Sequence, residues 1–536
     1  MKKLIALCLV IALLLCGCSG TAVQDFLRNL GALLGYSAVT SFEDMEYTRP
    51  DMDTFRQQLN DCLESAKTET SVKKLMEKVY ALYQTYYDFY TAYALSNIHY
   101  CQDLTDIYWD GEYTYCAENC AEVDAGLDQL LYALADCDLR EELEADDYFG
   151  EGFFDEYEGD SIWDDTFTAL MNREAALENE YYTLSAQAVD TDYYSDTFFE
   201  TCGAQMAELF VELIALRQEI AAYAGYDSYP QFAYDFYYYR DYTPEQAQSL
   251  LDDIQQQLVP LYADLPSDVW APYYDSCSES QTLAYAEECA NALGGTVAEA
   301  FQLMKKANLY DITYSENKYN ASFEIFLMSY YEPFIFINPT RTASDKLTLA
   351  HEFGHFCNDY ASGGSMAGVD VAEIFSQGME FLSLFYCEDT EDLERMKLAD
   401  SLCVFVEQSA YASFEQQVYS LTGDDLTVEN VQMLYEQIGT AYGFTSFGWD
   451  SRSYVLITHF FTNPMYIISY VVSNDAALQI YQLEQETSGA GAKLLQDNLT
   501  TQESYFLAFL ESAGLESPFE PGRADEIRKT MEKVLN

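Results

Sequence analysis

Residues 349–359 read LAHEFGHFCND, and this stretch sets two histidines four residues apart. On an α-helix, residues four apart lie on one face, so His351 and His355 can direct their rings at one point. Glu352 follows the first histidine and projects to the flank of that face. This H-E-x-x-H spacing suits a zinc ion held by two imidazoles, with a carboxylate beside the water that the metal activates. The stretch therefore predicts a helix that carries a catalytic zinc site.

The sequence on both sides of this stretch fits a helix behind a strand. Ser344 and Asp345 suit an N-terminal cap, and Gly363 and Gly364 break the apolar pattern. Upstream, residues 323–338 (FEIFLMSYYEPFIFIN) are rich in aromatic and β-branched side chains and predict two short strands. The second strand is either sheet core or the border of a cleft that pairs with an extended peptide.

A catalytic zinc ion needs a third protein ligand and one open position. The next expected helix, residues 368–386, offers Glu373 and Glu380, which share one face. They are separated by about 10 Å along the axis, so both cannot easily touch one ion. One should therefore bind the metal, and the other should orient a ligand histidine. Asp370 is a third candidate, although its position better suits a helix cap.

The rest of the chain is mostly helical in pattern. Residues 52–66, 71–95 and 198–225 space their apolar side chains at three and four. The chain has 536 residues, of which 49% are hydrophobic, so it can bury a large core. Proline is sparse, and neither an internal repeat nor a clear linker divides the sequence. We expect a mainly α fold that forms one catalytic unit over residues 41–536.

The charge of the chain is strongly acidic. Ninety acidic residues outnumber 26 basic ones, which gives a formal net charge of −64. Nucleic acid is therefore excluded as a partner, because binding to phosphate needs a basic patch. The acidic residues either form a solvated surface that resists aggregation, or line a cleft that attracts cationic peptides or metal ions.

The first residues predict export and lipidation. Residues 1–17 join a basic start, MKK, to an apolar run that is too short to span a membrane comfortably. Residues 15–18 (LCGC) resemble a bacterial lipobox, which implies cleavage before Cys18 and a lipid on that cysteine. Residues 18–40 would then be a tether, and the lipid would be the only contact with the membrane, at its extracellular face. The alternative is an ordinary signal peptide.

The sequence holds fourteen cysteines, most of them scattered between Cys62 and Cys403. An oxidising exterior would permit disulfides, but a chain of this size does not need them. Cys116 with Cys120, or Cys277 with Cys289, could form local pairs. Small buried thiols without partners are the alternative.

Three stretches resemble the oligoendopeptidase F and thimet oligopeptidase family of zinc metallopeptidases. They are PFIFINPTRTASDKLTLAHEFGHFCNDY (residues 333–360), VAEIFSQGMEFL (residues 371–382) and ITHFFTNPMYIISYVVSNDAALQIY (residues 457–481). By this resemblance Glu373 is the third zinc ligand and Glu380 has a supporting role. The family usually has another histidine where this chain has Asn358, and we expect that difference to leave the zinc site intact.

The third stretch implies residues that stabilise charge during the reaction. His459, Tyr466 and Tyr470 match a histidine and spaced tyrosines that contact substrate and oxyanion in the family. The physical reason is separate from the resemblance: hydrolysis builds negative charge on the former carbonyl oxygen, and fixed donors lower that barrier. A phenol and an imidazole are suitable donors, although the sequence does not say which tyrosine acts.

The resemblance implies a fold and an activity as well. The expected fold has two helical lobes, about residues 41–250 and 251–536, around a deep central channel, with a small β-sheet beside the zinc helix. Such a channel would admit short unstructured peptides and exclude folded proteins. We therefore expect a monomeric zinc endopeptidase with one zinc ion per chain and Glu352 as its base. The alternatives are an exopeptidase or narrowly specific metallopeptidase, and a peptide-binding lipoprotein that feeds a transporter.

Overall fold

The computed structural model describes residues 40–144, 149–150, 152–157, 162–187, 195–364, 367–444 and 449–535. The signal segment and the lipidation site expected at Cys18 lie outside these residues. Among the helices in the described ranges, none has both the length and the apolar character that a membrane crossing requires.

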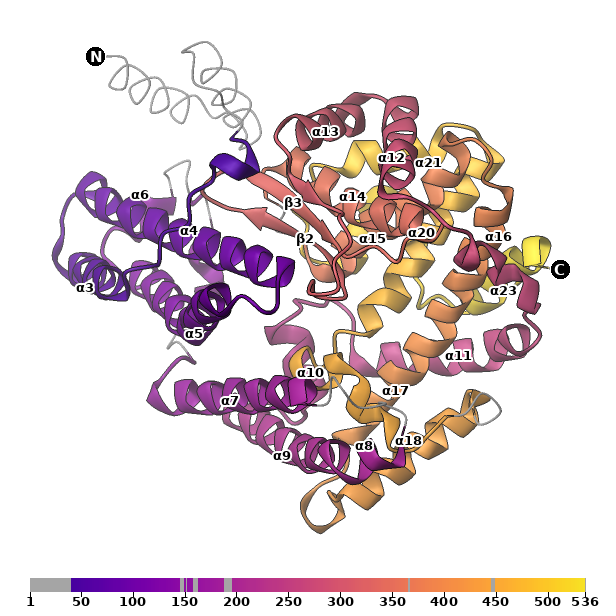
Figure 1. Ribbon diagram of the computed structural model, residues 1–536. Helices are drawn as coiled ribbons and strands as arrows, with labels where there is room; N and C mark the ends of the chain where they lie inside the picture. Colours follow the sequence, from indigo (N-terminus) through magenta and orange to yellow (C-terminus); the bar gives the residue numbers. More distant parts are fainter. Residues whose placement is uncertain are drawn as a thin grey trace. The chain divides into compact units, whose positions relative to one another are not determined.

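The chain divides into two compact units that alternate along the sequence (Figure 1). The two lobes expected from the sequence would each run continuously, whereas the chain passes several times between these units. The first unit contains the described residues up to Thr168, then Ala298–Pro339 and Asp359–Gly364, and the second contains Ala169–Val297, Thr340–Asn358 and Ser365–Asn536. The channel expected between the lobes stays a prediction.

The first unit contains a bundle of three long helices. Asp51 caps α3 (Met52–Thr68) by accepting hydrogen bonds from the backbone N–H groups of residues 53 and 54. The three helices bury one apolar face each, with Phe55, Val79 and Leu130 in the shared core. The helical elements of this unit are η1 (Phe42–Asp44), α3 (Met52–Thr68), α4 (Val72–Gln102), α5 (Ile107–Ala135), α6 (Arg140–Glu144) and η2 (Phe153–Tyr157).

A small sheet completes the first unit, in the strand order β1-β3-β2. The predicted strands are β2 (Ser322–Leu327) and β3 (Glu332–Ile337), which pair antiparallel. The two-residue strand β1 (Tyr310–Asp311), which the sequence analysis missed, pairs parallel with β3. Because β3 lies in the middle and all its residues are buried, it is sheet core, and β2 forms an edge.

The second unit is helical within the described residues, which confirms the mainly α fold class. Its first half contains α8 (Asp196–Glu200), α9 (Cys202–Tyr223), α10 (Tyr229–Phe236), α11 (Pro244–Ala263), η3 (Ser267–Tyr274), α12 (Glu279–Leu293), α15 (Val369–Tyr386) and α16 (Glu391–Cys403). Its second half contains the π-helical turn η4 (Val404–Gln408), α17 (Ser409–Val418), η5 (Gly423–Asp425), α18 (Val428–Ala441), η7 (Ser453–Leu456), α19 (Thr458–Thr462), α20 (Ile468–Glu486), α21 (Ala490–Asn498), α22 (Phe506–Ala513) and α23 (Arg523–Leu535).

Three helices begin in one unit and end in the other, and one of them carries the H-E-x-x-H stretch. They are α7 (Asp165–Gln187), α13 (Gly295–Lys306) and α14 (Asp345–Ser362). The helix α14 starts where the sequence predicts, but the Asp345 carboxylate turns back to bind the backbone N–H groups of Thr340 and Arg341. Gly363, with φ of +76°, follows its last turn, a conformation that glycine adopts without strain.

The interior of the second unit is built around α15. This helix is buried on every side, since nearly all its residues from Val371 to Leu384 are buried, the glutamates included. It packs lengthwise against α20, which is also buried along most of its length.

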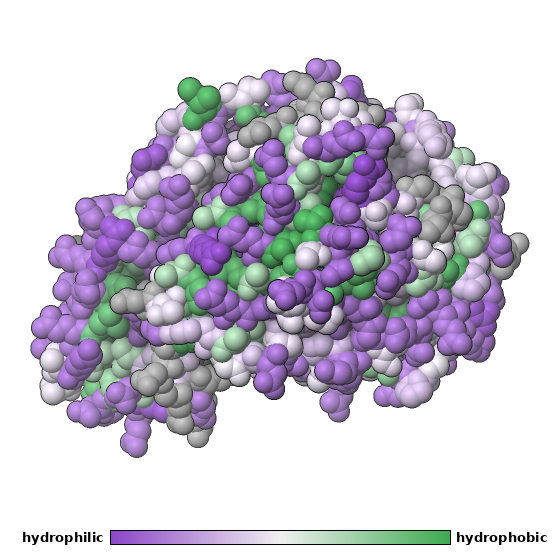
Figure 2. All heavy atoms as spheres, turned by 90° about the horizontal axis from the view of Figure 1, so that it is seen from below, coloured by the Kyte–Doolittle hydropathy of each residue, from purple (hydrophilic) through white to green (hydrophobic). Residues whose placement is uncertain are grey.

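On the outside, the face drawn in Figure 2 is covered mostly by hydrophilic side chains, in keeping with the solvated surface expected from the charge.

Candidate metal centre

The helices α14 and α15 approach each other closely at the middle of the H-E-x-x-H stretch. Gly354 stands between the two histidines, and a Cβ atom added there would lie 2.4 Å from the carbonyl oxygen of Phe375. Any larger side chain would therefore push the helices apart, because such a contact is far inside van der Waals distance. The glycine allows the histidines of α14 to face the glutamate of α15.

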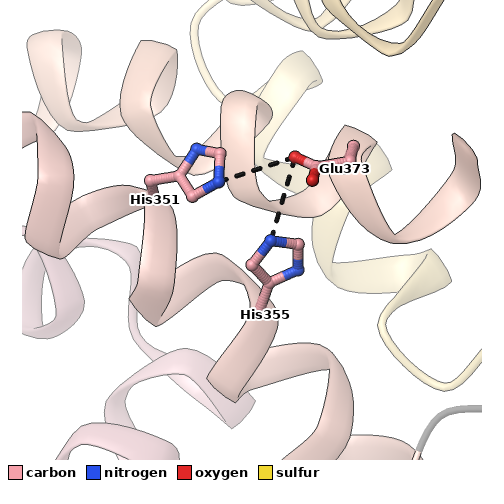
Figure 3. Close-up of side chains that lie close together, drawn as sticks. All are labelled: His351, His355 and Glu373. Carbon is pink, nitrogen blue, oxygen red and sulfur yellow. Dashed lines mark ion pairs between the residues drawn. The ribbon is translucent and has the colours of Figure 1, made fainter. Parts of the chain in front are cut away.

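His351, His355 and Glu373 direct their polar atoms at one point (Figure 3). Nε2 of His351 lies 3.5 Å, and Nε2 of His355 lies 3.9 Å, from Oε2 of Glu373. The three ligand atoms lie within 4.8 Å of one another. Two imidazoles and one carboxylate are the donor set of a hydrolytic zinc site, and zinc ligands stand at about 2.0–2.2 Å from the ion. The residues therefore fit a zinc ion.

Glu380 holds the other nitrogen of His351. Its Oε1 atom lies 2.9 Å from Nδ1 of His351, and its Oε2 atom lies 2.8 Å from Nζ of the buried Lys397. Burial alone would raise the pKa of Glu380, but Lys397 and His351 lower it below its usual range. The charged carboxylate fixes the tautomer and orientation of the ring, so that Nε2 faces Glu373.

The two histidines differ in their electrostatic surroundings. Burial favours the neutral ring of His351, but the hydrogen bond to Glu380 and the charge of Glu373 raise its pKa to about 9. Burial lowers the pKa of His355 to about 4. Negative charge is thus concentrated around His351, where a divalent cation would neutralise it.

Glu352 is buried on α14, with 5% of its surface exposed. Its charge contributes to raising the pKa of both His351 and Tyr470, after larger contributions from other groups. Glu352 is not one of the three clustered ligand residues, and its role as the base stays a prediction.

His459, Tyr466 and Tyr470 come together on the side of the site formed by α19 and α20. The hydroxyl of Tyr466 donates a hydrogen bond of 3.1 Å to Oε1 of Glu373. The hydroxyl of Tyr470 lies 3.4 Å from Nε2 of His459. Burial lowers the pKa of His459 and raises the pKa of both tyrosines, so the phenols keep their protons. The three side chains can therefore offer neutral hydrogen-bond donors at the site.

Two residues that the sequence left open have other tasks. The Asp370 carboxylate accepts hydrogen bonds from Arg240 and from Tyr242. Gly368 is the N-cap residue of α15 and Asp370 lies in the first turn, so Asp370 does not cap the helix. Its carboxylate is also not one of the three clustered ligand groups. Asn358 donates a hydrogen bond to the carbonyl of Leu499, so it fastens α14 to the chain after α21.

Two side chains that support the ligands were not predicted from the sequence. Ser376 donates a hydrogen bond of 3.0 Å to Oε2 of Glu373, and Lys397 pairs with Glu380 from the next helix. Ser376 stands one turn after Glu373, a spacing that could have indicated the contact. No spacing rule indicates Lys397, because its contact depends on how α16 packs on α15.

Comparisons with known proteins concern the fold and the N-terminal part of the chain. Residues 42–161 match the Peptidase M3 N-terminal domain. A structure of PZ peptidase A with an inhibitor shares 19% identity and a TM-score of 0.80, covering 92% of this chain and 99% of that one. A protein assigned to oligoendopeptidase F shares 22% identity and a TM-score of 0.79, covering 92% and 98%. No curated protein matches the sequence.

A second oligoendopeptidase F structure, from Bacillus anthracis, has 21% identity and a TM-score of 0.77, and the match covers 92% of this chain and 98% of that one. Identities this low show the fold alone. The domain match in residues 42–161 and this shared fold together confirm the predicted resemblance to oligoendopeptidase F and its M3 peptidase relatives, and they support a peptidase.

Proposed function

We propose that the chain is a zinc-dependent endopeptidase that hydrolyses short unstructured peptides. The proposal rests above all on one arrangement: His351, His355 and Glu373 gather their ligand atoms within 4.8 Å, with Glu352 beside them on α14. A peptide-binding lipoprotein would have no use for this set of residues. The match to the Peptidase M3 N-terminal domain adds independent support.

A single zinc ion held by His351, His355 and Glu373 would polarise the scissile carbonyl and make a water molecule easier to deprotonate. Glu352 would take a proton from that water as the water oxygen bonds to the carbonyl carbon, and would return the proton to the amine nitrogen as the C–N bond breaks. Tyr470 and His459 donate hydrogen bonds to the oxygen on which negative charge develops.

The direct test is hydrolysis of a library of quenched-fluorescent peptides, measured with and without a chelator. We expect cleavage of short peptides that the chelator stops and zinc restores. The variant Glu352→Gln should keep about one zinc ion per chain and lose roughly 10²–10⁴-fold in kcat, because only the proton transfer is removed. Full activity in this variant, or purified protein without zinc, would contradict the proposal.

The same library separates the narrower alternatives. An endopeptidase releases fragments from inside a peptide, whereas an exopeptidase releases terminal residues one or a few at a time. Mass spectrometry of the products therefore distinguishes the two activities. Cleavage of folded proteins as fast as short peptides would contradict the expected limit to unstructured substrates.

We also propose that the protein is a monomer anchored by a lipid on Cys18 to the extracellular face of the bacterial membrane. The support is the LCGC stretch at residues 15–18 and the apolar run that precedes it. Cys18→Ala should move the protein from the membrane fraction to the soluble fraction. Retention of that variant in the membrane fraction would argue against the anchor.

A further inference from the structure

A buried arginine, Arg240, joins the segment between α19 and α20 to the first turn of α15. One terminal nitrogen of its guanidinium donates to the carbonyl of Met465 at 2.9 Å, and the other donates to Oγ of Ser469 at 2.8 Å. Its Nε atom lies 3.2 Å from Oδ2 of Asp370. The three donors therefore bind three acceptors on the α19–α20 segment, on the first turn of α20 and on the first turn of α15. The planar fork of arginine can do this and a lysine cannot.

The surroundings of Arg240 keep it in one orientation. Its side chain has no exposed surface, and the rings of Tyr234 and Tyr238 each lie 4.4 Å from the guanidinium carbon. Tyr242 donates a second hydrogen bond to the paired Asp370. A charge removed from water is tolerated only where it is paired and hydrogen-bonded. An arginine so fully enclosed has a single arrangement available.

The backbone that Arg240 holds is strained and bound on several sides. Met465 has φ of +67°, a conformation that disfavours any residue with a Cβ atom. Its N–H donates to Oε1 of Glu415 at 2.8 Å, and its carbonyl accepts from Arg240. The carbonyl of Pro464, one residue earlier, accepts from the hydroxyl of Tyr238 at 2.8 Å. Three successive polar backbone groups are thus fixed by side chains from elsewhere in the second unit.

This fixed backbone comes directly before Tyr466, the tyrosine bonded to Glu373. Ser469, the second partner of Arg240 on this segment, precedes Tyr470 by one residue. On the other side, Asp370 stands one turn before Glu373 on α15. Arg240 therefore contacts both the tyrosine-bearing segment and the helix with the third metal ligand, and its bonds set the spacing between them.

We propose that Arg240 is a positioning residue that holds Tyr466 and Tyr470 at the distance from the metal centre that the reaction needs. The inference rests on the proposed peptidase function, and it names a group that touches neither substrate nor metal. Donors that stabilise developing charge act only at the correct distance, so a loosened segment weakens the transition state more than the bound substrate.

The chain offers a matched control in Arg523. This arginine is also buried, and its Nε atom lies 2.9 Å from Oδ1 of Asp475 on α20, five residues beyond Tyr470. Within the described part of the chain its hydrogen bonds and ion pairs go to Asp475, Glu516 and Glu526, and none of these lies in residues 463–469. Replacing Arg523 by lysine breaks a buried arginine–aspartate pair without releasing the tyrosine segment.

The test compares Arg240→Lys and Arg523→Lys in the full chain, with kcat, KM, bound zinc and hydrogen exchange of residues 460–470. We expect Arg240→Lys to lower kcat at least about tenfold, because small displacements of reacting groups are costly, while KM stays within about twofold. At saturating zinc it should still hold about one zinc ion per chain, and the amides of residues 460–470 should exchange faster. Arg523→Lys should keep the wild-type kcat and the wild-type exchange in that segment.

Each outcome decides the inference. Unchanged kcat and exchange in Arg240→Lys, or an equal loss of kcat in both variants, would overturn the positioning role. If Arg240→Lys does not fold, Ser469→Ala removes one of its three bonds and should give a smaller change in the same direction. If the wild type does not cleave peptides, the proposed function fails. Hydrogen exchange then still tests whether Arg240 holds this segment, because residues 460–470 should exchange faster in Arg240→Lys and not in Arg523→Lys.

Discussion

Glu373 and Glu380 stand seven residues apart on α15 and reach the two nitrogens of one imidazole, that of His351. Oε2 of Glu373 lies 3.5 Å from Nε2, and Oε1 of Glu380 lies 2.9 Å from Nδ1. The first glutamate would thus share a metal ion with the histidine, and the second holds the ring from its other edge. Two turns of helix, about 10 Å, separate their backbones, so the two carboxylates cannot easily bind the same ion. They instead contact opposite edges of one imidazole ring.

Replacing the orienting glutamate should weaken metal binding without removing a ligand. Glu380→Gln keeps the size of the side chain but loses the charge that holds Nδ1 of His351 and pairs with Lys397. We expect an affinity for zinc lower by about 10–100-fold, as for other partners of ligand histidines. Competition with a chromogenic chelator measures it. The exposed Glu388→Gln is the control, and equal affinities in both variants would contradict the role of Glu380.

The close approach of α14 and α15 predicts a different defect in Gly354→Ala. The added methyl group would meet the carbonyl of Phe375, so the helices must separate at the metal centre. We expect a loss of stability of about 1–3 kcal/mol from overpacking, together with weaker zinc binding. Gly111→Ala in α5 is the control, because nothing lies within 4 Å of its added Cβ. It should gain about 0.5–1 kcal/mol, and chemical denaturation with zinc titration measures both variants.

Replacing Tyr466 and replacing Tyr470 should have different effects on kcat and on zinc binding. The hydroxyl of Tyr466 is bonded to Glu373, whereas that of Tyr470 lies beside His459. Tyr470→Phe should therefore lower kcat by about 10²–10³-fold with little change in KM, as loss of an oxyanion donor does. Tyr466→Phe should mainly weaken zinc binding, because it removes a partner of the ligand carboxylate. The reverse pattern would assign the oxyanion to Tyr466.

The metal site could be predicted from sequence because its parts are local. His351, Glu352 and His355 lie on one helix, where the four-residue spacing alone brings the two rings together. The choice between Glu373 and Glu380 needed the resemblance, because both share one face of α15. The structure puts the first with the histidines' Nε2 atoms and the second at Nδ1, the division of tasks that the resemblance implies.

The supporting contacts could not be predicted from sequence, because they join elements far apart in the chain. Lys397 reaches Glu380 only through the packing of α16, and Arg240 reaches Met465 across 225 residues. In a chain with 90 acidic residues, no pattern indicates which aspartate pairs with which arginine. Asp370 is the example, since its place near the start of α15 favoured a cap, and a distant arginine binds it instead.

The buried Glu415 predicts a pH dependence of folding stability. Burial raises its pKa to about 8, against the opposing effects of its backbone hydrogen bonds and of Arg240 and Arg217. In the unfolded chain the same carboxyl loses its proton near its ordinary pKa of 4.5. Between these two values the folded protein holds one more proton than the unfolded chain, so the free energy of unfolding falls as pH rises.

Chemical denaturation of the wild type and of Glu415→Gln across about pH 5 to about pH 8 measures this contribution. The wild type should lose stability, on the order of a few kcal/mol, that the glutamine variant does not lose, because glutamine has no proton to release. Glu429→Gln on the exposed face of α18 should follow the wild type. If the free energies of unfolding of the wild type and Glu415→Gln change in parallel with pH, the prediction is wrong. Glu415 would then be ionised in the folded protein, with its charge stabilised by Arg240 and Arg217.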